Sequence, residues 1–294
     1  MNRRIFSHLA VAALFVSTVF AEPPFDLADS LARATKGEVA AQYTVARAYY
    51  KGEGADKNLA HAAEWFRKAA EQGDTKAQRL IATMLAQGEG VTKDEKAALA
   101  WFQKSAAQGD ILASTNLGWF YSQGIGSPKN MGEAIRHYRI AAKAGQLDAQ
   151  VRLGQLLTKG YDGVPVDYAE AAQYLLPAAE KGHAGAQNTL GVMLEEGLGV
   201  SKNPHAAVKM FRAAAEQGEP RAMMNMGRMY DAGTGIPRDP AQASMWLILS
   251  GERLEDGAEK YMRHLIETRR ISAEDYNVGL RLAKEYTAKA AGKK

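Results

Sequence analysis

The chain repeats one short phrase at an almost constant interval. Variants of Ala-Ala-x-x-Gly end at six glycines separated by 36, 36, 36, 37 and 36 residues. These glycines are Gly37, Gly73, Gly109, Gly145, Gly182 and Gly218. Periods of this length are typical of solenoids of helical hairpins, because one hairpin cannot bury its own apolar face whereas stacked neighbours bury it together. The period constrains the fold more than any other property of the sequence.

Each repeat begins with a predicted helix whose apolar positions share one face. Alanine stands four residues after every marker glycine, an aliphatic side chain or methionine stands eight after it, and a small residue follows directly. The small residues are Ala46, Ala82, Gly118, Gly154, Gly191 and Gly227. Offsets 4, 8, 11 and 12 lie on one side of a helix, so we expect this side to be core and the small residue to admit a neighbouring helix.

A second helix is predicted after a glycine-containing break. In five repeats the break holds a Gly-x-Gly pair, such as Gly52 and Gly54, which suits a helix end followed by a loop with positive φ. Plausible N-caps follow at Asn58, Asp94, Asn130, Asp167, Asn203 and Asp239. The helix then carries a bulky pair in each repeat: Trp65-Phe66, Trp101-Phe102, His137-Tyr138, Tyr174-Leu175, Met210-Phe211 and Trp246-Leu247. We expect these large side chains to pack opposite the small residues.

The full pattern resembles a known repeat family. It reads A-x-x-x-L-G-x-x-Y-x-x-G-x-G-V-x-K-D-x-x-x-A-x-x-W-F-x-x-A-A-x-x-G and is similar to the Sel-one-like repeat, a close relative of the tetratricopeptide repeat. The resemblance covers about Gly37 to Gly251. It implies an all-α, right-handed α-solenoid of stacked antiparallel helix pairs. It also implies an adaptor between proteins, often in the bacterial envelope or secreted, and specifies no catalytic activity.

The predicted domain organisation follows from these signals. We expect a signal peptide at 1–21, an N-terminal capping helix at 22–36, six repeats within 37–251, and C-terminal capping helices and a tail at 252–294. The expected repeats are 37–72, 73–108, 109–144, 145–181, 182–217 and 218–251. The last helix is expected to open with a capping box at Ser272-Ala273-Glu274-Asp275.

The first residues have the composition of an export signal. Arg3 and Arg4 precede an apolar run, Leu9 to Phe20, and Val19-Phe20-Ala21 fits a small-residue cleavage site. An uncleaved anchor is the weaker alternative, because the run is shorter than the ~18 residues that a span needs. We therefore expect a periplasmic protein, or alternatively a secreted one, without stable membrane insertion after cleavage. The absence of cysteine excludes a lipoprotein and disulfides.

Composition and motifs argue against several functional classes. Lys and Arg number 37 against 33 Asp and Glu, which is too neutral for a nucleic-acid footprint. No two histidines have metal-ligand spacing, and we predict no metal or cofactor. His137 falls in a core column, where we expect a satisfied buried imidazole. Met223, Met226 and Met229 could bind Cu(I), but they share the core face and are interpreted as packing.

We predict no enzymatic activity, because the sequence has no nucleophile elbow, acylation pair or Walker loop. One alternative is a hydrolase acting on cell-wall or β-lactam substrates, since some members of the resembled family have carried such labels; Glu195 and Glu196 are acidic candidates. Another is a module that binds peptidoglycan or another polysaccharide through groove aromatics.

The candidate recognition surface is the side of the first helices that the repeat does not fix. Offsets 6, 10 and 13 lie opposite the core face and vary freely in identity. In tetratricopeptide-like solenoids the first helices line a concave groove, so the resemblance implies that this row binds a protein partner. The predicted partner-binding residues are Tyr43, Arg47, Tyr50, Arg79, Trp119, Gln155, Asn188 and Arg228. Trp119 stands out because Trp and Arg often dominate interface energetics; the alternative is that it packs against a neighbouring helix.

The fourth repeat departs from the pattern. Its loop contains one extra residue between Gly160 and Gly163, and Pro177 lies inside its second helix. An interior proline removes a backbone hydrogen bond and can kink a helix. A bend in the superhelix and a tolerated local irregularity are both compatible with this sequence.

Overall fold

The computed structural model describes residues 26–161, 163–251 and 257–292, so the predicted signal peptide lies outside the described residues. The described residues form fifteen α-helices and no β-strand. The helices are α1 Leu27–Thr35, α2 Val39–Lys51, α3 Leu59–Glu71, α4 Thr75–Gln87, α5 Glu95–Ala107, α6 Ile111–Gln123, α7 Met131–Lys143, α8 Leu147–Leu157, α9 Tyr168–Glu180, α10 Ala184–Glu196, α11 Pro204–Glu216, α12 Pro220–Ala232, α13 Pro240–Gly251, α14 Gly257–Glu267 and α15 Ala273–Ala291.

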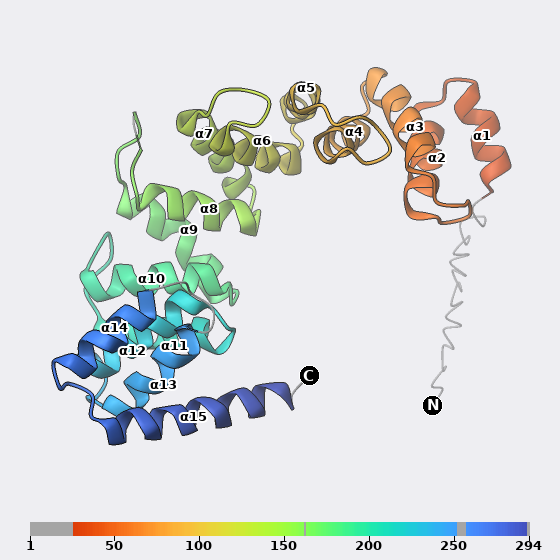
Figure 1. Ribbon diagram of the computed structural model, residues 1–294. Coiled ribbons are helices and arrows are strands. Elements are labelled where there is room, and N and C mark those ends of the chain that lie inside the picture. Colours follow the sequence, from red (N-terminus) through yellow and green to blue (C-terminus); the bar gives the residue numbers. More distant parts are fainter. Residues whose placement is uncertain (1–25, 162, 252–256, 293–294) are drawn as a thin grey trace, which may run out of the picture.

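The helices stack in chain order into an open arc (Figure 1). From α1 to α14, each helix packs mainly against the helices that precede and follow it in the chain. At the C-terminal end α15 returns along α13, and α14 also packs on α13. This arrangement confirms the predicted all-α solenoid of stacked helix pairs.

Side-chain caps and glycines set the helix ends as the sequence predicts. All six predicted Asn and Asp caps of the second helices accept a backbone N–H; Asp94, for example, accepts from Ala97 at 2.9 Å. The first helices of five repeats end at a glycine in the left-handed region, such as Gly52 at φ 76°. At the C-terminal end, Ser272 and Asp275 form the predicted capping box of α15.

In the four repeats whose small residue is glycine, this residue of the first helix lies directly under a large side chain of the second helix. A Cβ added to Gly118 would lie 2.6 Å from Cδ1 of the Tyr138 ring, and one added to Gly191 would lie 2.6 Å from Cε1 of Phe211. Both rings are almost fully buried. The predicted pairing of small and large residues is therefore confirmed, and the ring rests on bare backbone.

The second glycine of four of the five Gly-x-Gly pairs, Gly90, Gly126, Gly199 and Gly235, also makes a contact between repeats. A Cβ on Gly90 would lie 2.3 Å from the carbonyl oxygen of Leu59, in the first turn of the preceding second helix. The same close approach recurs between Gly126 and Glu95. The loop can touch the neighbouring helix only because it carries no side chain there.

The predicted irregularities leave the architecture intact. Helix α9 continues without interruption through Pro177 and has the same 13 residues as most of the others, which favours a tolerated irregularity. Met223, Met226 and Met229 are buried in the core, as the packing interpretation requires.

His137 is buried as expected, but the expectation of a satisfied imidazole is wrong. Its Nδ1 has no hydrogen-bond partner among the described residues. The reason is that Nε2 already faces the Arg136 side chain, 2.8 Å away, and no acceptor or donor of the neighbouring helices reaches the other nitrogen.

Candidate functional site

The eight predicted partner-binding residues lie on the first helices of the repeats, from α2 to α12, and differ in exposure. Arg47, Trp119 and Arg228 are exposed, whereas the other five are half-buried. The three exposed residues all stand at offset 10. The rows at offsets 6 and 13 are less open than predicted, because their members Val151 and Asp231 are buried. The accessible part of the row is therefore centred on offset 10.

Trp119 is the most prominent side chain of this row. Trp119 is 43% exposed, whereas the next residue, Phe120, is only 2% exposed. The centroids of the two rings lie 5.6 Å apart. Leu112, seven residues earlier on the same helix, is 44% exposed. Trp119 is therefore not fully buried against a neighbouring helix. Helix α6 thus presents an indole and an aliphatic side chain on one exposed face.

The tyrosines of α2 support the core as well as the surface. Tyr43 and Tyr50 pack edge-on against Phe66, with ring centroids 5.7 and 6.2 Å apart. The Tyr50 hydroxyl donates to Glu89 of the second repeat at 3.2 Å, and burial followed by the Glu89 charge raises the pKa of Tyr50. Arg47 keeps a side chain 53% exposed beside Glu53, at 3.6 Å. Arg47 is thus the residue of this cluster that is most available to a partner.

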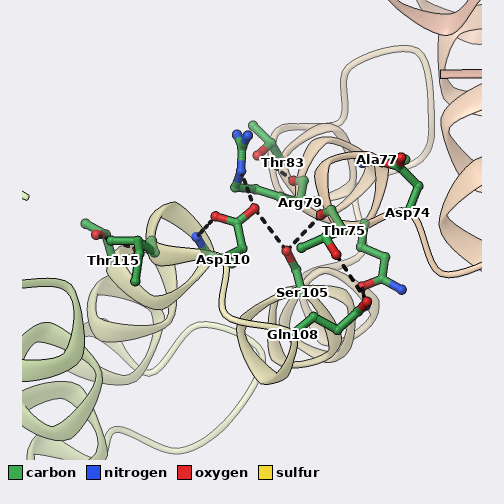
Figure 2. Close-up of polar contacts among 12 residues, drawn as sticks. Asp74, Thr75, Ala77, Arg79, Thr83, Ser105, Gln108, Asp110 and Thr115 are labelled. Atoms are coloured by element: carbon green, nitrogen blue, oxygen red, sulfur yellow. Dashed lines mark hydrogen bonds and ion pairs between the residues drawn. The ribbon is translucent and has the colours of Figure 1, made fainter. Parts of the chain in front are cut away.

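Arg79 is held by the next repeat (Figure 2). Its Nε donates to Asp110 Oδ2 at 2.9 Å, and the two side chains are only 21% and 11% exposed. Asp110 also caps α6 by accepting from the Ala113 N–H at 3.0 Å. Ser105 donates to the Thr75 carbonyl at 2.9 Å and lies 3.2 Å from Asp110. Arg79 therefore ties α4 to α6 rather than standing free for a partner.

The residues of the last repeats also bridge neighbouring first helices. Asn225 on α12 donates to Asn188 on α10 at 3.0 Å. Arg228 lies 3.7 Å from Glu195, whose pKa is raised mainly by burial. Glu195 thus forms an ion pair with Arg228 of the next repeat. Between these repeats and α6, Gln155 is half-buried on α8.

Sequence reasoning missed a set of buried glutamines that link consecutive helices. Five residues after the marker glycine, Gln42, Gln78, Gln150 and Gln187 each donate to the carbonyl of an alanine in the preceding helix, at 3.1 to 3.3 Å. Glutamines at the end of second helices extend this set: Gln108 donates to Gln78 at 2.8 Å. In the sequence, a Gln directly follows the alanine at offset 4 in four of the six repeats. We missed its role because we considered only the apolar positions of this helix face.

The open side chains of the first helices form a contact surface. Within ranges 26–161, 163–251 and 257–292, no group of three or more His, Asp or Glu side chains could hold a metal ion. Among the same residues, no helix is long and apolar enough to cross a bilayer. The open features of the row are the indole of Trp119 and the guanidinium groups of Arg47 and Arg228, with Leu112 exposed beside the row; these groups suit binding through packing and hydrogen bonds.

Fold and surface together define an α-solenoid repeat protein. The Sel1 repeat profile matches residues 39–74, 75–110, 111–146, 147–183, 184–219 and 220–253, which is most of the chain. The chain belongs to the Sel1 repeat family, and the resemblance stated from the sequence is confirmed.

Solved structures agree with this assignment. The crystal structure of c5321, a protective antigen present in uropathogenic Escherichia coli strains and displaying an SLR fold, has 28% identity and a TM-score of 0.64 over 91% of this chain. This chain spans 64% of that protein's length. A Sel1 repeat protein from Oxalobacter formigenes has 28% identity and a TM-score of 0.61, covering 79% of this chain and 98% of the other. No curated protein matches the chain significantly.

Proposed function

We propose that the chain is an exported, non-enzymatic scaffold that binds a protein partner through the first-helix face centred on Trp119. Sel1 repeat proteins are commonly protein-interaction scaffolds, which is the coarse function that the family supports. The observation that carries the finer proposal is that Trp119 is 43% exposed in the offset-10 row, whose other members are Arg47, Thr83, Gln155, Val192 and Arg228. An indole left in water at such a position gains by being covered.

The shape of the stack supports the use of this face. Figure 1 shows α4 and α6 nearer the inside of the arc than α5 and α7. A partner segment lying along the inside would meet Trp119, Arg47 and Arg228, which share offset 10 on their helices. Arg79 and Asn188 would act indirectly, by fixing the spacing of the helices beneath.

The cellular location is part of the same proposal. The sequence predicts export to the periplasm, with secretion as the alternative, and the similar protein of uropathogenic Escherichia coli is described as a protective antigen. That description supports an envelope or external location for this chain. Cleavage after Ala21 would be read directly from the N-terminal sequence of the protein purified from its native cell.

Crosslinking in the native cell tests the binding face. A photo-crosslinker placed at Thr83, beside Trp119 in the offset-10 row, should capture a specific protein, and Trp119→Ala should reduce the capture at least tenfold, as expected for a hot-spot side chain worth ~2 kcal/mol or more. Leu176→Ala is the matched control, because Leu176 is 42% exposed on the second helix α9. Equal capture by wild type and Trp119→Ala would contradict the proposal.

The two alternative functions, a polysaccharide-binding module and a hydrolase, predict different experimental results. Capture of peptidoglycan or another glycan in place of protein would favour a polysaccharide-binding module. Turnover of a β-lactam or cell-wall substrate by the purified chain, abolished by Glu195→Gln, would favour the hydrolase.

A further inference from the structure

A slot that holds tryptophan in the first two repeats is only partly filled in the third. In the first repeat, Trp65 on α3 packs against a buried cluster that includes Ala34 on α1 and Val45 on α2, and Tyr49 on α2 packs against the same cluster. The residues two periods of 36 later are His137, Leu117, Tyr121 and Ala106. Together with neighbours on α5, α6 and α7, these four residues line a pocket of about 260 Å³. An imidazole is smaller than an indole, so the third slot stays open.

The walls of this pocket suit an aromatic ring. His137 stacks on Tyr121 with ring centroids 5.7 Å apart and an interplanar angle of 11°. Leu117 and Ala106 contribute apolar surface, and Ile140 at the rim is 42% exposed. The pocket therefore has π-faces and apolar walls but access to solvent.

The polar groups of the pocket are fixed in their roles. Arg136 Nη2 lies 2.8 Å from His137 Nε2, and a guanidinium can only donate. Nε2 is therefore the acceptor, and the proton of the neutral imidazole is on Nδ1. The Arg136 side chain is 54% exposed at the rim. Arg136 also donates to Glu133 Oε2 from Nε and Nη2 at 3.0 and 2.8 Å, and its guanidinium lines the pocket beside any ring that enters.

The other repeats indicate the occupant. In the first two repeats, a lysine three residues after the tryptophan covers the indole, with Lys68 Nζ 4.1 Å and Lys104 Nζ 4.2 Å from the ring centroids of Trp65 and Trp101. A cation over an indole face is a favourable arrangement. The third repeat keeps the apolar walls and has Arg136 as the exposed cation, but it lacks the indole.

We propose that the His137 pocket binds one tryptophan side chain presented by a partner polypeptide. A volume of about 260 Å³ is below the ~300 to 1,000 Å³ of pockets for whole small-molecule ligands, so it fits a single side chain. The indole comes from another polypeptide, because three of the four tryptophans of this chain, Trp65, Trp101 and Trp246, pack in their own repeats. The fourth, Trp119, stands two residues before Tyr121 on α6, about 160° round the helix from it.

The test uses the full mature chain and N-acetyltryptophanamide, with N-acetylleucinamide as the matched probe. In an NMR titration, the ring signals of Tyr121 and His137 should shift saturably with the tryptophan probe, with a dissociation constant on the order of 1 mM, as for a ligand of this size. The leucine probe should shift them at least tenfold less. Absence of shifts at both rings, or an equal response to both probes, would overturn the proposal.

A substitution in the pocket gives a second test that does not depend on comparing the tryptophan and leucine probes. His137→Trp restores the residue of the first two repeats, so the variant should fold, fill its own slot and lose at least tenfold in affinity for the tryptophan probe. His264→Trp, at an exposed position of α14, should bind like wild type. Undiminished binding by folded His137→Trp would overturn the proposal, and the direct titration of wild type decides it should that variant fail to fold.

The other possible source of the indole is a second copy of this chain, which would insert its exposed Trp119. Sedimentation of wild type and Trp119→Ala separates this case: concentration-dependent self-association that disappears in both Trp119→Ala and His137→Trp would replace the proposed partner by a second copy. The pocket and the first-helix face are independent, so Trp119→Ala should leave the probe titration unchanged even where the scaffold proposal fails.

Discussion

At the residue scale, a side chain on the variable side of a first helix either pairs with the neighbouring repeat or stays exposed. The sequence alone does not always tell which. Arg79 and Trp119 both stand in the row that the repeat leaves free. Arg79 is paired with Asp110 at 2.9 Å, whereas Trp119 remains 43% exposed. The difference depends on what the next repeat places opposite each residue. Column identity predicts which side of the helix a residue occupies, and only the packing of two repeats decides whether it is engaged.

His137 gives a prediction at this scale. Burial, and then the neighbouring Arg136 charge, lower the pKa of His137 to about 4, against the opposing effect of Glu133. The folded protein should keep His137 neutral as the pH falls from about 6.5 to about 4, while the unfolded chain takes up a proton there. The free energy of unfolding should therefore decrease as the pH falls through this window.

NMR titration of the His137 ring signals and denaturant unfolding at several pH values check this prediction. His137→Trp removes the titrating group, so its stability should depend less on pH over the same window. A midpoint near 6.5 for His137 in the folded protein would contradict the prediction.

At the element scale, helix ends carry more than local capping. Asp110 accepts the Ala113 N–H as the N-cap of α6 and also holds Arg79 and Ser105 from the preceding repeat. Gly90 ends a break and also admits the first turn of α3 against its backbone. The caps and breaks could be predicted because each pattern recurs six times or nearly so. Their second contacts could not, because those contacts depend on the angle between neighbouring hairpins, which no single repeat encodes.

Asp110→Ala should therefore destabilise the protein more than an ordinary cap deletion. We expect a loss of about 2 to 3 kcal/mol in the free energy of unfolding, because the cap is lost and Arg79 is left half-buried without its partner. Asp94→Ala is the matched control: Asp94 caps α5 by accepting from Ala97 at an exposed site, and its loss should cost ~1 kcal/mol.

Urea unfolding of both variants measures the difference, and Asp110→Ala combined with Arg79→Met completes a double-mutant cycle. Equal losses for Asp110→Ala and Asp94→Ala would show that the Arg79 contact contributes nothing to stability.

At the scale of the whole molecule, contacts from α1 to α14 run almost entirely between consecutive helices and α15 packs on α13, so stability is a sum of neighbouring interfaces. The closing helix α15 belongs to the last of these interfaces. It covers α13, with the Tyr286 ring 5.5 Å from that of Trp246 and Gly279 against Ser244. The period predicted this architecture and the presence of closing helices. The way α15 folds back along α13 depended on non-repeating residues, for which the sequence supplied no second copy to compare.

Removing residues 273–294 should loosen only the C-terminal part of the stack. We expect amide hydrogen exchange to accelerate strongly in α12 and α13, because the Trp246 face would become exposed, while α2 to α6 keep their protection. A chain ending at Ala291 is the control, since it retains the whole of α15. Uniform loss of protection in all repeats would contradict nearest-neighbour stability.

The two ends of the stack are closed by unlike elements, one short helix α1 and the pair α14 and α15. The arc consequently has a direction. An elongated ligand laid along it would meet the repeats in ascending order in one orientation and in descending order in the other. Because the offset-10 residues change from arginine through threonine, tryptophan, glutamine and valine to arginine, these orientations are not equivalent in energy. The molecule would therefore select both the sequence of a bound chain and the N-to-C direction in which that chain lies along the arc.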